Sequence, residues 1–128
     1  MLMIDTIKLS LKLKDGMILN RRRFRCVFSS DQFTKWAYEQ NQEEKSGGIY
    51  FPKVEIIKLG SKWNVSLELS IPKLLHGENL IGIHNNEWQK VPEILIERLR
   101  LMRIVLKKDE LLNAHVTILH LAMDFLLP

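Results

Sequence analysis

The sequence predicts an α+β fold, in which a mostly antiparallel sheet of about five strands carries one main helix packed on a face. Three observations lead to this prediction. Apolar and polar residues alternate along several short segments, as in strands with one buried face. Short turn signals join these segments, which favours antiparallel hairpins. Residues 92–106 instead repeat apolar residues at helical spacing. With 128 residues, 46% of them hydrophobic and 27% charged, the chain is most simply one globular domain, residues 1–128.

The first two expected strands are rich in basic residues. Residues 4–14 alternate strictly between apolar and mostly basic positions, and Asp15-Gly16 is a turn signal. A second strand is expected over residues 23–28, and we predict that the two strands pair. Phe24 and Phe28 alternate with charge in it, so we expect both rings to face the core. The pairing would place five basic residues on a single surface: Lys8, Lys12, Lys14, Arg23 and Arg25.

The middle of the chain is expected to contain a short helix and a hairpin. Ser29 or Ser30 can N-cap a helix that holds Phe33, Trp36 and Ala37 on one side, before an exposed loop over residues 40–48. Two strands, over residues 50–59 and 63–71, flank the turn Gly60-Ser61 and predict an antiparallel hairpin. Pro72 has no N–H to donate, so strand pairing should stop there.

The C-terminal third should supply the helix and the last strand. A loop is expected over residues 74–86, after which Pro92 suits the first turn of a helix that runs to about Leu106. The nearly continuous apolar run from 115 to 127 predicts a central strand, buried on both faces. The expected core includes Leu9, Leu11, Val54, Ile56, Leu67, Leu69, Leu95, Leu99, Met102 and Ile118.

Positive charge is concentrated near the N-terminus. The whole chain has a net charge of +4, and within residues 1–30 Lys and Arg greatly outnumber Asp5 and Asp15. Such a concentrated field favours a polyanion as partner, with a solvated basic face as the alternative. The single cysteine, Cys26, excludes an internal disulfide and fits a reducing compartment. No apolar run approaches the roughly 18 residues of a membrane span, and no signal-peptide pattern is present. We therefore expect a cytoplasmic protein without a membrane partner.

One segment resembles a known family. The string Ser-Ile-Pro-Lys-Leu-Leu-His-Gly-Glu-Asn-Leu at 70–80, preceded by Leu-Glu-Leu, resembles the strand-to-loop signature in the N-terminal part of phage and plasmid rolling-circle replication initiators. These proteins are related to the filamentous-phage nicking and relaxing protein, and residues 3–10 also resemble their opening. The resemblance implies the N-terminal domain of a longer initiator, truncated or stand-alone, that binds single-stranded or origin duplex DNA.

The resemblance and the charge distribution together give the expected DNA-binding residues. Phosphate contacts of this kind would position the DNA without reading its sequence. The residues are Lys8, Lys12, Lys14, Arg21, Arg22, Arg23, Arg25 and Lys73. Basic and aromatic residues also interleave at 23–25 and 50–53, a mixture that suits contact with a single strand.

Catalytic residues of the family are not recognisable. Many members carry two histidines separated by one apolar residue, which can hold a divalent metal, and a tyrosine nucleophile. Here His115 and His120 should point to opposite faces of a regular strand, and His76 and His84 fall in the expected loop.

The two tyrosines, Tyr38 and Tyr50, also lack the setting of a nucleophile. We expect no catalytic residue, metal site or cofactor in this chain alone, with a divalent metal relevant only to the full-length enzyme. Two alternatives remain open. One is a minimal metal-dependent DNA-nicking enzyme that uses Tyr38 or Tyr50. The other is a protein–protein docking module that binds the remainder of a larger initiator or a second copy.

Overall fold

The computed structural model describes residues 2–76 and 90–123, and side-chain surroundings over residues 6–75 and 90–114. Its strands are β1 (Leu2–Lys12), β2 (Phe24–Ser29), β3 (Phe33–Tyr38), β4 (Lys53–Leu59), β5 (Lys62–Ser70) and β6 (His115–Met123). Its helices are the 3-10 turn η1 (Arg21–Arg23), α1 (Gln42–Ser46), α2 (Ile71–His76), α3 (Val91–Leu101) and α4 (Lys108–Leu112). The predicted α+β class, with a mainly antiparallel sheet and one main helix against it, is confirmed.

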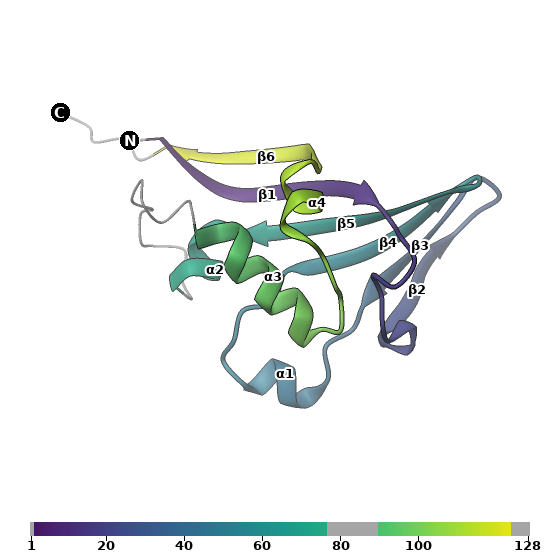
Figure 1. The fold of residues 1–128 in the computed structure, drawn as a ribbon, viewed down its shortest axis with the longest axis horizontal. Helices are drawn as coiled ribbons and strands as arrows, with labels where there is room; N and C mark the ends of the chain where they lie inside the picture. The colour runs from purple at the N-terminus through teal and green to yellow at the C-terminus, as the bar shows by residue number, and fades with distance from the viewer. Residues whose placement is uncertain (1, 77–89, 124–128) are drawn as a thin grey trace.

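All six strands belong to one sheet, in the order β2-β3-β4-β5-β1-β6, and every neighbouring pair is antiparallel (Figure 1). The strands β2 to β5 form a meander of successive neighbours, and β1 lies between β5 and β6. The predicted hairpin over residues 50–71 is therefore confirmed. Strand β5 ends at Ser70, just before Pro72 as expected, and α2 occupies residues 71–76, where the loop was predicted to begin. The remaining expected loop, residues 77–86, lies outside the described residues.

The predicted pairing of the first two strands is wrong, because β3, β4 and β5 lie between β1 and β2. The chain does turn at Asp15-Gly16, where Gly16 has a φ of 80°. It then buries Met17 and Ile18 in the core. Ile18 forms an isolated bridge with Ile104, and the Val105 amide donates to the Met17 carbonyl at 2.7 Å. The apolar residues after the turn thus lead the chain across the helical side of the sheet.

Two further predictions need correction. Residues 33–38 form β3 instead of a short helix, because pairing with strands on both sides satisfies their backbone, and the helix α1 begins only at Gln42. Strand β6 is an edge strand: in the part of the chain that the structure describes, it pairs with β1 alone. The prediction of a central strand, which rests on its apolar run, is therefore wrong.

The core lies between the sheet and the helices α2 and α3, which Figure 1 shows on one side of the sheet. Helix α3 starts with Pro92 in its first turn, as predicted, but ends at Leu101 instead of near Leu106. Arg103 then adopts a φ of 62°, and the chain leaves the helix to pair with residues 17–19.

Most of the predicted core is confirmed. Leu9 is only half-buried but packs against the core, and the side chain of Ile118 lies outside the described residues. The predicted residues that are buried are Leu11, Val54, Ile56, Leu67, Leu69, Leu95, Leu99 and Met102.

No helix within residues 2–76 and 90–123 has the length and apolar character needed to cross a membrane.

Candidate nucleic-acid interface

The sheet has a second face, which points away from the buried side chains of Leu67 and Leu69, and we call it the open face. Strand pairing defines which residues share it, because directly opposed residues lie on the same side of a sheet. One row of such pairs crosses five strands. It contains Lys12, Asn64, Ile57, Lys35 and Phe28.

The open face is predominantly basic. Lys12, Arg25, Lys53 and Lys62 are exposed on it. Two glutamates belong to the same face, and one of them, Glu55, is only 6% exposed, with its Oε2 atom 3.7 Å from Lys35 Nζ. The basic residues of the open face within the described strands are Lys8, Lys12, Arg25, Lys35, Lys53 and Lys62, and the acidic residues are Glu55 and Glu68.

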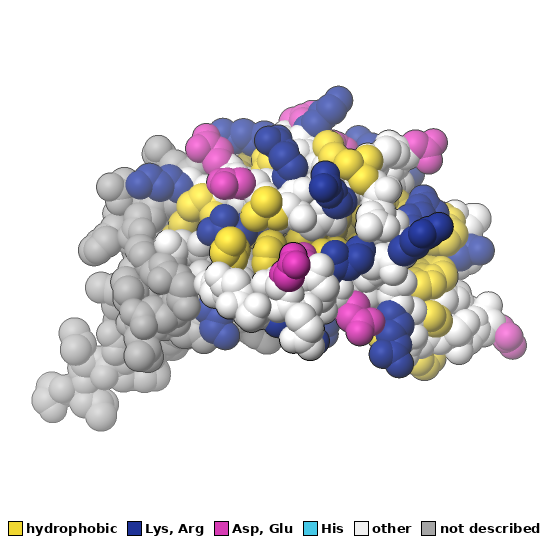
Figure 2. Space-filling view, turned by 90° about the horizontal axis from the view of Figure 1, so that it is seen from below, with side chains coloured by type: hydrophobic (Ala, Val, Ile, Leu, Met, Phe, Trp, Pro, Cys, Tyr) yellow, Lys and Arg dark blue, Asp and Glu magenta, His cyan; other side chains and the backbone are white. Residues whose placement is uncertain are grey.

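The open face also carries two aromatic rings. Phe28 and Phe33 stack with a centroid distance of 4.7 Å and an interplanar angle of 22°, and Phe28 is 48% exposed. The prediction that Phe28 faces the core is wrong. A bulge at Val27 shifts the register between Cys26 and Phe28, and this shift moves Phe28 to the opposite side of the sheet. Phe24, before the bulge, packs against the core as predicted. Figure 2, seen from the side on which α1 lies in Figure 1, shows that Lys and Arg side chains also lie among apolar ones outside the open face.

The predicted basic residues do not all lie on one surface. Lys8, Lys12 and Arg25 share the open face, although they come from non-adjacent strands. Lys14 lies beyond the end of β1, where its Nζ atom is 3.2 Å from Glu110 Oε2. Arg23 forms an ion pair with Glu44. Arg21 and Arg22 are exposed in η1, and Lys73 is exposed on α2.

Glu44 is the centre of a polar cluster that fixes Tyr38. Its carboxylate accepts hydrogen bonds from the Tyr38 hydroxyl at 2.7 Å, from the backbone N–H of Asn41 at 3.0 Å and from the guanidinium of Arg23. The guanidinium of Arg23 also lies 4.9 Å from the centroid of the Tyr38 ring and donates to the Glu39 carbonyl at 3.0 Å. The Asn41 side chain accepts from the Glu44 amide, which completes a capping box at the start of α1.

These contacts shift the ionisation of the cluster. Burial, and then the hydrogen bond to Glu44, raises the pKa of Tyr38 to about 12. Burial alone would raise the pKa of Glu44, but the hydrogen bonds from Asn41, Tyr38 and Arg23 together place this pKa below its ordinary value. The hydrogen bond to Glu44 raises the pKa of Arg23. The cluster therefore holds Tyr38 as a neutral phenol.

The second tyrosine lines a cleft at the opposite end of the sheet from the Phe28–Phe33 pair. The cleft has a volume of about 690 Å³, and the predicted DNA-binding residue Lys73 lines it together with Lys45 and Lys53. The Tyr50 hydroxyl accepts a hydrogen bond from the Ser70 amide at 2.8 Å. Tyr50 thus supports the backbone where β5 passes into α2.

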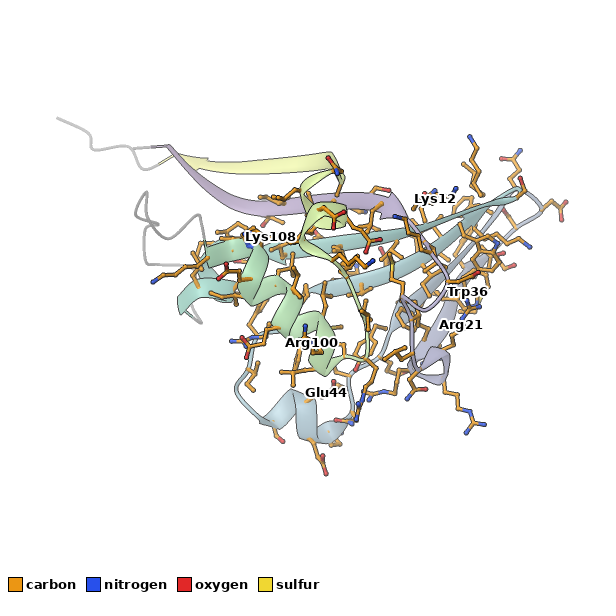
Figure 3. All side chains as sticks on the ribbon, viewed as in Figure 1. Lys12, Arg21, Trp36, Glu44, Arg100 and Lys108 are labelled. Carbon is orange, nitrogen blue, oxygen red and sulfur yellow. The ribbon has the colours of Figure 1, made fainter. Side chains whose placement is uncertain are left out.

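The helical side of the sheet carries a second aromatic group that sequence reasoning did not identify. Trp36 and Trp63 stack with a centroid distance of 5.4 Å and an interplanar angle of 13°. They line a hollow of about 240 Å³ together with Arg21, Phe24 and Ile56. Figure 3 shows Arg21 beside Trp36, at the β2–β3 end of the molecule and away from Arg100 and Lys108. The sequence predicts a helix around Trp36, and this prediction hides its contact with Trp63 across β4.

Residues that could bind a metal do not gather within the described part of the chain. Among the residues that the structure describes, no group of three or more His, Cys, Asp or Glu side chains is close enough to hold an ion. The side chains of His76, His84, His115 and His120 lie outside those residues.

Comparisons with known proteins found no similarity: no family model, no curated protein and no solved structure matches this chain.

Proposed function

We propose that this chain is the DNA-binding domain of a phage or plasmid replication initiation protein, located in the cytoplasm and non-catalytic by itself. A single DNA strand lies across its open face. The observation that carries the proposal is the combination of exposed cations with the exposed Phe28–Phe33 pair on one face of the sheet. The resemblance of residues 70–80 to the replication initiators supports the same function.

The chemistry of this face suits a single strand. Lysine and arginine neutralise phosphates and release bound counterions, which gives affinity without sequence specificity. Exposed aromatic rings stack on unpaired bases, whose flat faces are hidden inside a duplex. Phe28 supplies such a ring, with Lys35 directly opposite it on β3 and Arg25 on its own strand.

The setting of Tyr38 supports binding without nicking. A tyrosine nucleophile has to be activated, by a lowered pKa or a neighbouring base. Tyr38 instead has a raised pKa, because it is partly buried and donates to Glu44. We expect no relaxed circles when the purified chain is incubated with supercoiled origin DNA and magnesium or manganese. Relaxation that Tyr38→Phe or Tyr50→Phe abolishes would favour the nicking enzyme instead.

The test of the open face is a pair of charge-matched variants. The first replaces Lys12, Arg25 and Lys62 by glutamine, because these side chains are exposed on the open face. The second replaces Lys90, Arg100 and Lys108 by glutamine, which removes the same charge from exposed positions in the α3–α4 region. Lys35 is left intact because it neutralises the buried Glu55.

Binding of a labelled single-stranded oligonucleotide is measured by fluorescence anisotropy over a series of salt concentrations. We expect the first variant to lower the slope of log affinity against log salt by about 2, or roughly 0.7 for each lost phosphate contact. Phe28→Ala should weaken binding by about 5- to 150-fold, the range for loss of one stacked base. Equal effects of the two triple variants, or no binding by the unchanged chain at low salt, would refute the proposal.

A second candidate function, a protein-docking module, is favoured by exposed apolar side chains in the helical layer. Leu101, Val105 and Leu112 are 53%, 44% and 64% exposed, and the neighbouring Leu19 is 61% exposed. If these side chains bind a second copy, sedimentation should show association that depends on concentration and that Leu101→Ser with Leu112→Ser abolishes. A monomer at all accessible concentrations would exclude self-association through this surface.

A further inference from the structure

The hollow on the helical side of the sheet has a defined floor, walls and rim. Ile56 forms its floor: it is 5% exposed and lies directly opposite Trp36 on the neighbouring strand. Trp36, Trp63 and Phe24 form apolar walls, and Arg21 lies exposed beside them. Another cation is close, because Lys58 Nζ lies 5.2 Å from the centroid of the Trp63 ring.

Core packing does not close over this group of rings. The interior of a folded domain is filled to the density of an organic crystal, and apolar side chains that only close a core leave few voids. Here the rings of Trp36, Trp63 and Phe24 remain half-buried around an open volume of about 240 Å³. The helices α2 and α3 cover the aliphatic part of the same face but leave this aromatic part accessible.

The charges around the hollow restrict the ligand. No carboxylate lines it in the part of the chain that the structure describes, and Arg21 and Lys58 are both cationic. A cationic ligand, which aromatic rings alone would attract, is therefore repelled. A ligand that joins a flat ring to a negatively charged group fits both the apolar walls and the basic rim.

We propose that this hollow binds one unpaired nucleotide, with the base stacked against the Trp36 side of the tryptophan pair and the phosphate beside Arg21. The inference rests on the proposed function and extends it to the other side of the sheet. The hollow and the open face lie on opposite sides. Among the described strands, β2 forms the edge between them, and Trp36 lies on β3, directly next to β2. A strand that leaves the open face near Phe28 reaches the hollow by passing around this edge.

The test uses thymidine monophosphate as probe and tryptophan fluorescence as readout. The measurement is made in a Trp88→Phe background, so that emission comes only from Trp36 and Trp63. We expect saturable quenching by thymidine monophosphate. Arg21→Gln should weaken its binding by about two- to fivefold, the range for an exposed ion pair, and should leave the binding of uncharged thymidine unchanged. Arg100→Gln is the matched control, because Arg100 is exposed and remote from the hollow, and it should have no effect (Figure 3).

A second variant removes the stacking surface. Trp36→Leu should weaken the binding of both thymidine and thymidine monophosphate by about 5- to 150-fold. If this variant fails to fold, the comparison of Arg21→Gln with Arg100→Gln decides. Absence of quenching, or an equal affinity of the Arg21→Gln variant and its parent for thymidine monophosphate, would overturn the inference.

The outcome is separable from that of the proposed function. The triple variant of Lys12, Arg25 and Lys62 should lose affinity for the oligonucleotide but still show full quenching by thymidine monophosphate. Oligonucleotide binding without any quenching would overturn the nucleotide site and leave the open-face function standing. Quenching without oligonucleotide binding would support the nucleotide site and refute the function proposed for the open face.

Discussion

The environment of Tyr38 predicts a loss of stability at high pH. Burial and the hydrogen bond to Glu44 raise the pKa of Tyr38 from 10 to about 12 in the folded chain. The unfolded chain therefore loses the phenol proton first as the pH rises. The stabilisation is fully present below pH 10, and it is lost as the pH rises through about 12.

The size of the effect follows from linkage. A pKa that is higher by two corresponds to at most about 2.7 kcal/mol. Tyr38 is only partly buried, and solvent screens its interactions, so we expect a decrease of about 1–2 kcal/mol in the free energy of unfolding over this range.

The assay is denaturant unfolding at a series of pH values for the unchanged chain and for Tyr38→Phe. Subtracting the two curves removes the contributions that the two chains share. We expect the free energy of unfolding of the unchanged chain, relative to that of Tyr38→Phe, to decrease by about 1–2 kcal/mol as the pH rises from 10 to about 12. The ultraviolet absorbance of the phenolate, followed in a Tyr50→Phe background, should show Tyr38 ionising near pH 12. Identical pH dependence of the two chains, or ionisation of Tyr38 near pH 10, would refute the reasoning.

Three further predictions concern stability. Leu99→Ala should lower the free energy of unfolding by about 2–5 kcal/mol, because Leu99 is buried. Leu101→Ala makes the same change at a 53% exposed position of α3 and should change this free energy by less than about 0.5 kcal/mol. Similar costs of the two variants in urea unfolding would contradict the assigned helix face. The pKa of Glu44 is lowered in the folded chain, so its stabilisation is present above the ordinary value of 4.5 and is lost as the pH falls through the folded value. Glu44→Gln should therefore reduce the loss of unfolding free energy at acidic pH. The same pH dependence in the two chains would count against the cluster. Gly60→Ala should lower the free energy of unfolding by about 1–2 kcal/mol because Gly60 has a φ of 62°, while its added Cβ would meet no neighbouring atom. Gly60→Asn should cost less, because asparagine tolerates this conformation better. Equal thermal unfolding of these two variants and the unchanged chain would exclude the left-handed turn.

The sequence was sufficient where a pattern repeats locally. Alternation over β4 and β5 and the Gly60 turn between them predicted a hairpin, and the apolar stripe of α3 predicted Leu95 and Leu99 in the core. These features depend on periodicity and on neighbours in the chain, which a single sequence contains.

Features that depend on distant partners were not predictable in this way. Nothing near β1 indicates that it pairs with β5 and β6, and nothing near Trp36 indicates that strands flank it on both sides. The candidate site depends on one such feature. Simple alternation places Phe24, Cys26 and Phe28 on one face, and only the bulge at Val27, which requires β3 as partner, moves Phe28 to the open face.

The position of β1 in the sheet has a consequence for how the chain folds. Strands β2 to β5 find their partners in neighbouring segments, so this meander closes only short loops when it forms. Strand β1 pairs with β5 and β6, and the pairs Leu9 with Leu67 and Ser10 with His115 join residues far apart in the sequence. Closing such long loops is slow, because the entropy cost comes before the contacts that offset it. During synthesis β1 leaves the ribosome before the other five described strands, and it can complete its pairing only after β5 and β6 have followed.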